Sequence, residues 1–274
     1  MLASAASFTA ETILIKQLGG EWATPVMLFW RQAVGLLILL PFLLRRSNAA
    51  FGTPRPGLML VRSVFGIAGL VLSYIAIQGL PLAEANALSF TRPLFLVVLA
   101  GLLLREKVTP ARMAAAVVGF IGVLMIVRPD GLSSSATLAQ MAALGAAILF
   151  ALTILSVKAM ARDHSPFTLM TYATLLGLVL IAPWAAVLWR WPSGQEALLL
   201  TALGAVSLLT QGCYIKGMQG GDASVMGLVD YTRIIFALAA GWLFFGDLPR
   251  LITLAGAGVI IGATVYVTRS EKTA

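Results

Sequence analysis

Long apolar runs dominate the chain, and short polar or charged stretches with proline and glycine separate them. An α-helix needs about 20 mostly apolar residues to cross a bilayer, and most of these runs approach that length. The pattern therefore predicts ten membrane-spanning helices, at residues 2–17, 25–44, 58–78, 82–104, 110–127, 137–158, 166–189, 196–216, 223–245 and 251–268. Because the connecting loops are short, we expect an all-α membrane protein without an attached soluble domain.

The composition agrees with this prediction and adds an orientation. Only 11% of the 274 residues are charged and 59% are hydrophobic, whereas soluble domains carry roughly 25% charged residues. The net charge is +8, but the basic residues lie between the apolar runs and form no single patch, so we expect no nucleic-acid partner. With a cytoplasmic N-terminus, twelve basic residues lie inside and four outside, which favours cytoplasmic positions for both termini.

The two halves of the chain resemble each other weakly along their whole length. An offset of 141 residues, or 142 in some segments, matches Thr91 with Thr232, Arg92 with Arg233, Glu106 with Asp247 and Lys16 with Lys158. Residues 1–130 and 131–274 are therefore expected to be copies of one five-helix unit. Five is an odd number, so the second copy must cross the membrane in the opposite sense. Inverted repeats are a transporter architecture with a binding site near the midplane between them, so a central cavity is expected.

Two segments carry a resemblance to a known family. They read "ALSFTRPLFLVVLAGLLLREKVTPARMAAAVVGFIGVLMIVRP" and "GLVDYTRIIFALAAGWLFFGDLPRLITLAGAGVIIGATVYVT". The chain resembles the ten-helix, double EamA-repeat branch of the drug/metabolite transporter superfamily. The resemblance implies a bacterial-type inner-membrane carrier that moves a small metabolite by alternating access, with the lipid bilayer as surroundings. We expect no cofactor and no metal.

The resemblance leaves the substrate open between two readings. Within the superfamily the chain looks most similar to YddG-type exporters of aromatic amino acids, which makes amino-acid export the favoured function. The alternative is an importer or facilitator of another metabolite, with nucleotide-like, cofactor-like or S-adenosylmethionine-like chemistry. Direction of transport and coupling ion stay open.

Two arginines lie near the middle of predicted spans, Arg92 in 82–104 and Arg233 in 223–245. An arginine at this depth costs about 2.5 to 3.5 kcal/mol on insertion scales, so such residues face a cavity or a partner. A guanidinium can bind a substrate carboxylate through two hydrogen bonds. The structural alternative is an ion pair with Asp230, one helical turn before Arg233. Ser89 takes the equivalent place before Arg92, so Arg92 is the less neutralised arginine and the stronger substrate candidate.

Pro93 follows Arg92 directly and cannot donate the helical hydrogen bond to the carbonyl of Ser89. We expect a kink or hinge in the span at midplane depth. Irregular backbone is tolerated there where it lines a cavity, although a kink that only improves packing is equally compatible with the sequence.

Polar and aromatic residues on two other spans are expected to form matching walls of the cavity. Tyr74 and Gln78 share one helical face, and Gln211, Tyr214 and Met218 share another at repeat-equivalent places. Tyrosine could stack on an aromatic or cationic solute, whereas the alternative is a tyrosine belt at the membrane interface. Weaker candidates are Trp30, Phe90, Tyr172 and Tyr231.

Proton coupling would need a titratable group in the membrane, and the acidic candidates are Glu11, Glu84 and Asp230. Glu84 stands near the start of its span, where an acid could simply stabilise the helix N-terminus. Glu11 lies deeper and has Lys16 five residues away, a spacing that aligns a pair poorly. A facilitator without proton coupling stays open.

Other classes of protein find little support in the sequence. There is no HExxH metal helix and no Gly-x-Ser-x-Gly nucleophile elbow, so we do not expect an enzyme. Two isolated arginines do not make the continuous polar lining of a channel. The small-residue pattern GVIIG, residues 258–262, fits close helix packing. The family resemblance allows this pattern to bring spans 110–127 and 251–268 together, and a homodimer contact is the alternative.

Overall fold

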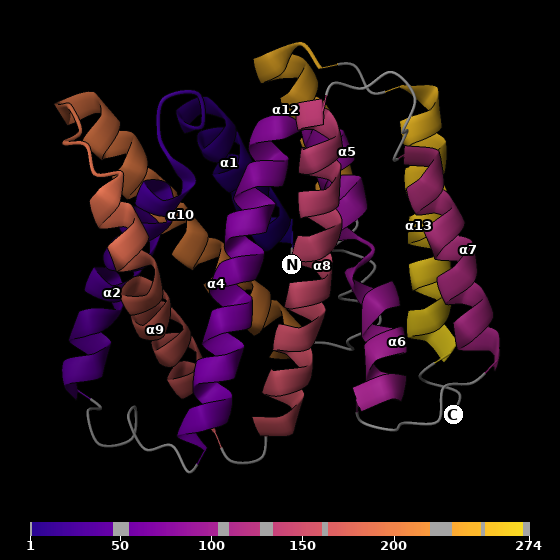
Figure 1. Ribbon diagram of the computed structural model, residues 1–274, viewed down its shortest axis with the longest axis horizontal. Coiled ribbons are helices and arrows are strands. Elements are labelled where there is room, and N and C mark those ends of the chain that lie inside the picture. The colour runs from indigo at the N-terminus through magenta and orange to yellow at the C-terminus, as the bar shows by residue number, and fades with distance from the viewer. Residues whose placement is uncertain are drawn as a thin grey trace.

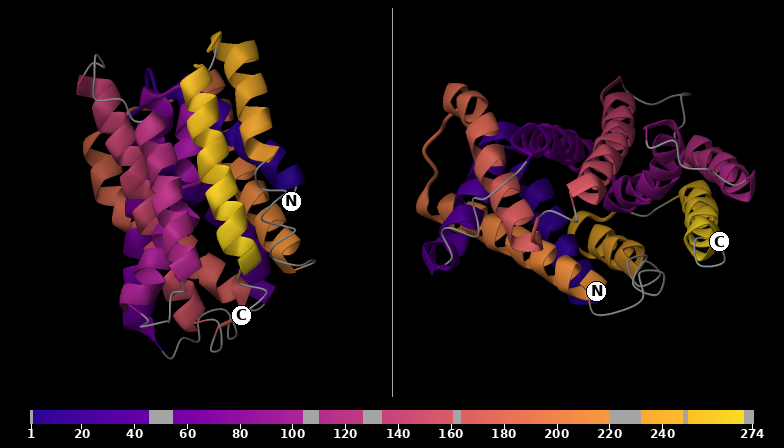
Figure 2. Two further views of the ribbon diagram at one scale, coloured as in Figure 1. Left: turned by 90° about the vertical axis from the view of Figure 1, so that its right-hand side faces the viewer. Right: turned by 90° about the horizontal axis from the view of Figure 1, so that it is seen from below.

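The chain folds into a bundle of helices that lie side by side (Figures 1 and 2). The computed structural model describes residues 2–45, 55–103, 110–126, 134–160, 164–219, 232–247 and 250–270, and all regular secondary structure in them is helical. The helices are α1 (Leu2–Leu18), α2 (Thr24–Arg45), α4 (Pro56–Gly79), α5 (Leu82–Ser89), α6 (Arg92–Leu103), α7 (Pro110–Ile126), α8 (Ser134–Met160), α9 (Pro166–Val187), α10 (Gly194–Gln219), α12 (Thr232–Phe245) and α13 (Leu251–Ser270).

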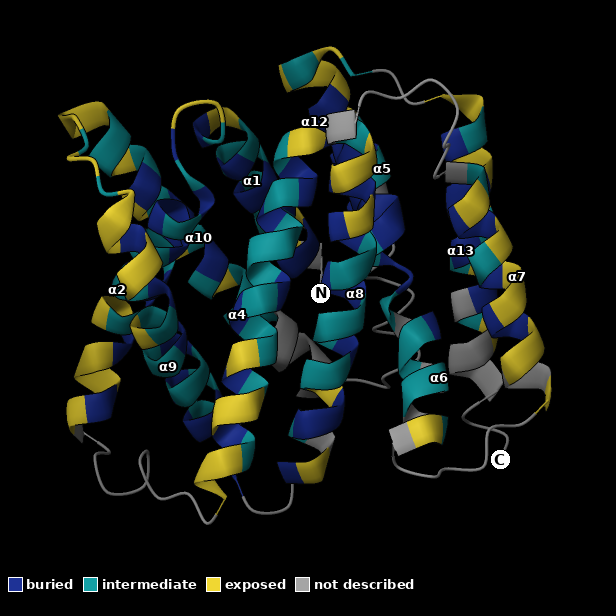
Figure 3. Cartoon of the chain, in the orientation of Figure 1, coloured by how far each residue is buried: buried dark blue, intermediate teal, exposed yellow. Residues whose placement is uncertain are grey.

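Each of the ten expected ranges contains a described helix, and α5 and α6 together occupy the fourth. The ninth is represented by α12, and the earlier part of its expected range lies outside the described residues. Five described helices are long and apolar enough to cross a membrane, and α7, α12 and α13 contain shorter apolar stretches. Large apolar side chains such as Leu44, Leu124 and Leu251 stand exposed on the outer faces of the bundle (Figure 3). This exposed apolar surface suits a lipid environment.

The fourth span is interrupted at the middle of the bundle, where α5 ends at Ser89 and α6 begins at Arg92 (Figure 1). The amides of Phe90 and Thr91 donate to carbonyls three residues back, and the Thr91 hydroxyl also donates to the Leu88 carbonyl at 2.7 Å. These tight turns satisfy backbone groups at the point where the α-helical hydrogen bonds stop. The interruption lies directly before Pro93, as the missing proline donor requires.

Helix contacts follow the symmetry of the inverted repeat. Helix α4 packs on α8 and its equivalent α10 packs on α1; α2 packs on α10 and its equivalent α9 packs on α4. The self-equivalent pairs α2 with α9, α5 with α12 and α7 with α13 are also in contact. The fold is therefore two inverted five-helix units that close around one another.

The α7–α13 contact depends on different glycines from those expected. A side chain at Gly122 would lie 2.8 Å from the backbone oxygen of Gly256 and 2.9 Å from Ile260, so these backbones approach closely. Gly258 and Gly262 have nothing within 4 Å of their side-chain positions. The GVIIG glycines thus face away from α7, although the two helices do pack together as expected.

One helix end sets up a contact between the repeats. Helix α12 ends at Phe245 and is followed by Gly246, whose φ of 66° is left-handed. The Gly246 amide donates to the Trp242 carbonyl at 3.2 Å, and the Asp247 amide donates to the Gly241 carbonyl at 3.0 Å. Glycine adopts this conformation without steric cost, and the paired hydrogen bonds are those of a Schellman cap. The cap directs Asp247 to Lys16 of α1, and their side chains meet at 2.6 Å.

Candidate functional site

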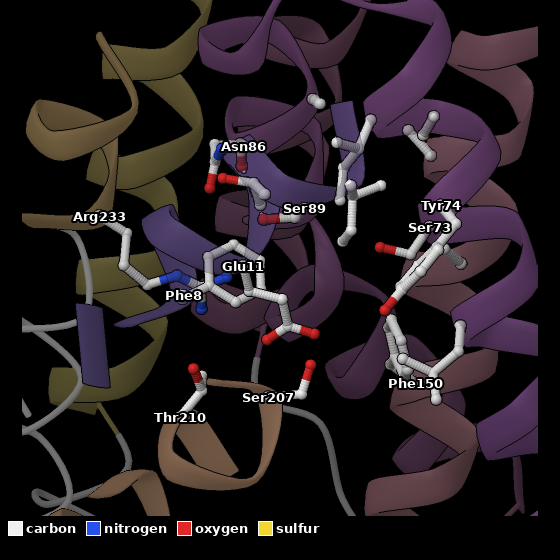
Figure 4. Close-up of a pocket in the computed structure, with 18 of the residues that line it drawn as sticks. Phe8, Glu11, Ser73, Tyr74, Asn86, Ser89, Phe150, Ser207, Thr210 and Arg233 are labelled. Carbon is white, nitrogen blue, oxygen red and sulfur yellow. Dashed lines mark hydrogen bonds between the residues drawn. The ribbon is translucent and has the colours of Figure 1, made fainter. Parts of the chain in front are cut away.

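A cavity of about 220 Å³ lies between the two repeats, at the level where α5 and α6 meet. Both halves of the chain contribute to its walls, through α1, α2, α4, α5 and α6 from the first half and α8, α10 and α12 from the second. Alanine and serine side chains on α5 and α8 leave the space open, and aromatic and polar side chains surround it (Figure 4). A cavity between the repeats is where inverted-repeat carriers generally hold their substrates.

Two of the arginines that line the cavity each lie over a phenylalanine of the opposite repeat. The guanidinium carbon of Arg92 is 4.7 Å from the centre of the Phe150 ring, and that of Arg233 is 3.7 Å from the Phe8 ring. An offset of 142 residues matches Phe8 with Phe150, so the two cation–π pairs are repeat-equivalent. The inverted repeat therefore builds the same charged and aromatic pair on two sides of one cavity.

A buried ion pair also faces the cavity. The Arg31 Nε of α2 donates to the Glu11 carboxylate of α1 at 3.3 Å, and both side chains are at least nine-tenths buried. Lys16, which the sequence offered as a partner for Glu11, binds Asp247 instead. A spacing of five residues along α1 turns the Lys16 side chain away from Glu11.

Hydroxyl and amide groups complete the polar lining. The Tyr74 hydroxyl faces the Ser207 hydroxyl, and neither oxygen has a hydrogen-bond partner of ordinary geometry among the described residues (Figure 4). The Asn86 side-chain amide donates to the Leu82 carbonyl at 2.8 Å. The Asn86 side-chain oxygen is buried and has no hydrogen-bond partner among the described residues. Buried polar atoms of this kind are costly unless something hydrogen-bonds them, so these two sites are candidates for contact with a polar solute.

The structure brings several of the residues singled out from the sequence to this cavity. Arg92, Arg233, Tyr74, Ser89, Gln211 and Glu11 all line it. The Phe90 ring is 5.9 Å from the Arg233 guanidinium carbon, but Phe90 is not one of the residues that line the cavity.

Other residues from the same set lie elsewhere. The Gln78 amide contacts the Thr24 hydroxyl and the Met27 sulfur, at the end of α4 and outside the cavity lining. Trp30 stacks on Trp189, with ring centres 6.4 Å apart. Tyr172 packs against a separate cluster of Met59, Met160 and Leu169. These three are therefore not part of the cavity.

Glu84 is also away from the cavity. Its carboxylate accepts a hydrogen bond of 2.7 Å from Gln140, in the first turn of α5. This position at the helix N-terminus matches the structural role rather than the coupling role. Asp230 and Tyr231 lie outside the described residues, as do the side chains of Tyr214, Met218 and Pro93.

Several residues that line the cavity were not predicted from the sequence. Phe8, Phe150 and Ser207 look like ordinary packing residues, and Asn86 lies between alanines. No role is predicted for Arg31 from the sequence, although a third arginine inside an apolar span is itself a signal. The 142-residue match of Phe8 with Phe150 was a second signal, since it follows the match of the arginines that they contact.

The described lining carries three guanidinium groups and one carboxylate. It offers no group of three or more metal-binding side chains within the described residues. Such a lining can bind acceptor-rich or anionic solutes, and it can stack a flat ring between the phenylalanines.

Comparison with known proteins decides the family. The model of the EamA-like transporter family matches the chain twice, over residues 1–128 and 137–269. The chain belongs to this family. It is thus a multi-pass membrane transporter of the drug/metabolite transporter superfamily, with small-molecule substrates and a lipid bilayer as its surroundings.

Curated relatives align with this transporter along almost its full length. A riboflavin transporter of Brucella anthropi is 30% identical over 99% of this chain and 98% of its own. The pseudopaline exporter CntI of Pseudomonas aeruginosa is 30% identical over 99% of this chain and 96% of its own. An S-adenosylmethionine uptake transporter of Rickettsia felis is 28% identical over 100% of this chain and 92% of its own.

A solved crystal structure shares the fold, with a TM-score of 0.62 at 20% identity over 99% of this chain and 98% of the other. The expected superfamily is confirmed by these findings. The narrower resemblance to YddG-type exporters is not supported, since these relatives are transporters of riboflavin, pseudopaline and S-adenosylmethionine. Their names favour the alternative substrates over amino-acid export.

Proposed function

We propose that this transporter carries a flat, acceptor-rich heteroaromatic metabolite of the riboflavin type across the inner membrane. The observation that supports this most is the pair of Arg–Phe contacts, Arg92 with Phe150 and Arg233 with Phe8, on one central cavity. The resemblance of the whole chain to a riboflavin transporter supports the same substrate class.

The lining matches the chemistry of an isoalloxazine ring. Its flat faces can stack on Phe8 and Phe150, and such aromatic contacts contribute about 0.5 to 1.5 kcal/mol each beyond burial. Its ring carbonyls accept hydrogen bonds, which Arg92 and Arg233 can donate. The ribityl hydroxyls can satisfy Tyr74 and the other polar atoms that lack partners in the described chain.

The same lining is a poor match for the competing substrates. An amino acid needs a carboxylate for its ammonium group, and the described lining offers only Glu11, which already binds Arg31. S-adenosylmethionine carries a sulfonium cation, which three lining arginines would repel. The positive lining therefore favours neutral acceptor-rich or anionic solutes.

Transport itself would follow from the fold. The two halves, residues 1–130 and 131–274, would rock about the α7–α13 and α2–α9 contacts and open the cavity to each side in turn. The distribution of basic residues supports cytoplasmic positions for both termini.

Counterflow in proteoliposomes tests the substrate. Vesicles containing the purified transporter are loaded with unlabelled riboflavin, and entry of labelled riboflavin is followed against empty-vesicle controls. We expect saturable entry that unlabelled riboflavin suppresses, and no suppression by phenylalanine, tryptophan or S-adenosylmethionine. Exchange of an amino acid or of S-adenosylmethionine without exchange of riboflavin would overturn the proposal.

A further inference from the structure

The Asn86 side chain of α5 lines the cavity and is held in one orientation by its own helix. Its side-chain nitrogen donates to the Leu82 carbonyl, one helical turn earlier, at 2.8 Å. Because a carbonyl can only accept, this bond determines which end of the amide group is the nitrogen and which is the oxygen. The residue is 3% exposed, and its side-chain oxygen has no hydrogen-bond partner among the described residues. A donor on a solute would remove the cost of this unpaired oxygen.

The neighbouring groups of the lining do not supply that donor. The Ser89 hydroxyl is the nearest along α5, but it donates to the main-chain carbonyl of Asn86 at 2.7 Å. The charged groups of the described lining are three arginines, which only donate, and Glu11, which binds Arg31. The side-chain oxygen of Asn86 therefore adds an uncharged acceptor to a lining whose charged groups are mostly donors.

Asn86 and Arg233 lie on the same side of the cavity. Helix α5 packs on α12, which carries Arg233. The Phe90 ring, one turn after Asn86, is 5.9 Å from the Arg233 guanidinium carbon. In Figure 4 both residues stand across the cavity from Tyr74 and Phe150. The edge of a solute on this side of the cavity therefore meets a donor and an acceptor together.

We propose that Asn86 is a specificity-determining residue, which accepts a hydrogen bond from an N–H group that lies between two carbonyls of the solute. The isoalloxazine ring carries such an edge, in which the N3–H group lies between the carbonyls at C2 and C4. Arg233 donates to one of these carbonyls, and the Asn86 oxygen accepts from the N–H group. This inference rests on the proposed function, because it needs a flavin in the cavity.

The proposal implies selection against flavins that lack this N–H group. Such a flavin fills the cavity with the same ring and the same ribityl chain but leaves the Asn86 oxygen unpaired. A binding site that hydrogen-bonds an N–H group of its substrate rejects the analogue without it more strongly than an apolar site rejects a change in size. Asn86 would thereby distinguish solutes that the arginines and the phenylalanine rings bind equally well.

A comparison of riboflavin with 3-methylriboflavin, in which a methyl group replaces the N3 hydrogen, tests the proposal. Both flavins fluoresce, so titration with the purified transporter in detergent gives a Kd for each. The wild-type protein is expected to bind riboflavin about tenfold more tightly than the analogue. In Asn86→Ala the Kd of riboflavin is expected to rise about tenfold, whereas that of 3-methylriboflavin should not rise, because the analogue never makes the bond. Retained binding of the analogue also shows that the variant is folded.

Gln140→Ala is the matched control. Gln140 is another buried amide, 2% exposed, whose side-chain oxygen has no partner among the described residues, but it does not line the cavity. This variant is expected to bind both flavins as the wild type does.

The outcomes separate this inference from the proposed function. Equal binding of the two flavins by the wild type, or an unchanged Kd of riboflavin in Asn86→Ala, would overturn the role of Asn86 and leave the substrate assignment standing. Equal weakening of both flavins in Asn86→Ala would also overturn it, since Asn86 would then contact another part of the flavin, such as the ribityl hydroxyls. Absence of riboflavin binding by the wild type would overturn both proposals. A preference lost in Asn86→Ala and kept in Gln140→Ala supports the role of Asn86.

Discussion

The guanidinium carbon of Arg233 lies 3.7 Å from the centre of the Phe8 ring, and the two residues belong to opposite repeats. The equivalent contact joins Arg92 to Phe150 at 4.7 Å. Each midplane cation is therefore positioned by a helix of the other repeat. In the proposed transport cycle, rocking of one repeat against the other would change how both arginines face the cavity and would thereby link substrate binding to the conformational change.

Removal of either arginine is expected to impair riboflavin exchange. A hydrogen bond to a charged group contributes about 1.5 to 3 kcal/mol, so Arg92→Gln should raise the half-saturating riboflavin concentration about tenfold or more. Arg233→Gln should do the same and also lower the melting temperature in detergent, because Arg233 is only 8% exposed. Counterflow titrations and thermal unfolding measure the two effects.

Arg62→Gln is the control for these variants. Arg62 is a membrane-helix arginine that donates to the Leu169 carbonyl at 3.0 Å and does not line the cavity. Its half-saturating riboflavin concentration should equal that of the wild type. Equal affinity in Arg92→Gln as well would remove Arg92 from the binding site.

The phenylalanine rings are expected to matter for affinity. Phe8→Leu and Phe150→Leu keep an apolar side chain but remove the ring that holds each arginine and stacks on the solute. A cation–π contact contributes about 0.5 to 2 kcal/mol, so each variant should weaken riboflavin binding about 2- to 30-fold. Phe8→Trp and Phe150→Trp keep an aromatic face, so both variants should bind riboflavin about as tightly as the wild type if stacking on that face sets the affinity.

Phe120→Leu gives the comparison. Phe120 makes an edge contact with Phe95, at 5.0 Å between ring centres, away from the cavity. It should lower stability without changing the half-saturating concentration. A loss of affinity as large as that of Phe8→Leu would show that general packing, and not the cavity rings, sets the affinity.

The Lys16–Asp247 pair is expected to stabilise the contact between α1 and the end of α12. Its atoms are 2.6 Å apart and its side chains are 17% and 29% exposed, while Lys16 also lies 4.7 Å from the Phe245 ring. A double-mutant cycle with Lys16→Met and Asp247→Asn should give a coupling energy of about 1 kcal/mol. Thermal or denaturant unfolding in detergent provides the four stabilities.

The exposed Arg190–Glu21 pair, at 3.6 Å with side chains 48% and 72% exposed, is the reference cycle. Its coupling energy should be close to zero, since solvent screens both charges. Equal values for the two cycles would mean that burial and the Gly246 cap add nothing to the Lys16–Asp247 contact.

Gly122 is expected to be intolerant of a side chain, whereas Gly258 is not. Gly122→Ala places a carbon against the Gly256 backbone oxygen, so α7 and α13 must separate, and the melting temperature should fall by an amount corresponding to about 1 to 3 kcal/mol. Gly258→Ala meets no neighbour and should leave stability unchanged.

Gly258→Leu also tests the homodimer alternative. A larger side chain on this outward face would disrupt a contact between two copies, and size-exclusion chromatography with light scattering would register the change in mass. An unchanged mass for wild type and variant, equal to one chain, would support a monomer. Equal destabilisation by Gly122→Ala and Gly258→Ala would contradict the glycine contact described here.

The spans and their repeat were predictable because the bilayer imposes a simple rule. Each crossing needs a long apolar run, so the boundaries of α2, α9 and α13 match the expected ranges within a few residues. Membrane burial also makes charges rare, which is why Arg92, Arg233 and Glu11 stood out before their positions were known. Gln78 and Trp30 were candidates for the cavity lining but lie outside it. The position of a residue on a helix does not show which neighbouring helix its face will contact.

The sequence by itself determined the crossings, the duplication and the presence of charges at midplane depth, since all three follow from local hydropathy and from self-similarity along the chain. Only the tertiary structure decided the pairs: Glu11 with Arg31, Lys16 with Asp247, and each arginine with a phenylalanine of the other repeat. These partners lie up to 231 residues apart. Their meeting depends on how ten helices rotate and pack against one another, which no local pattern specifies.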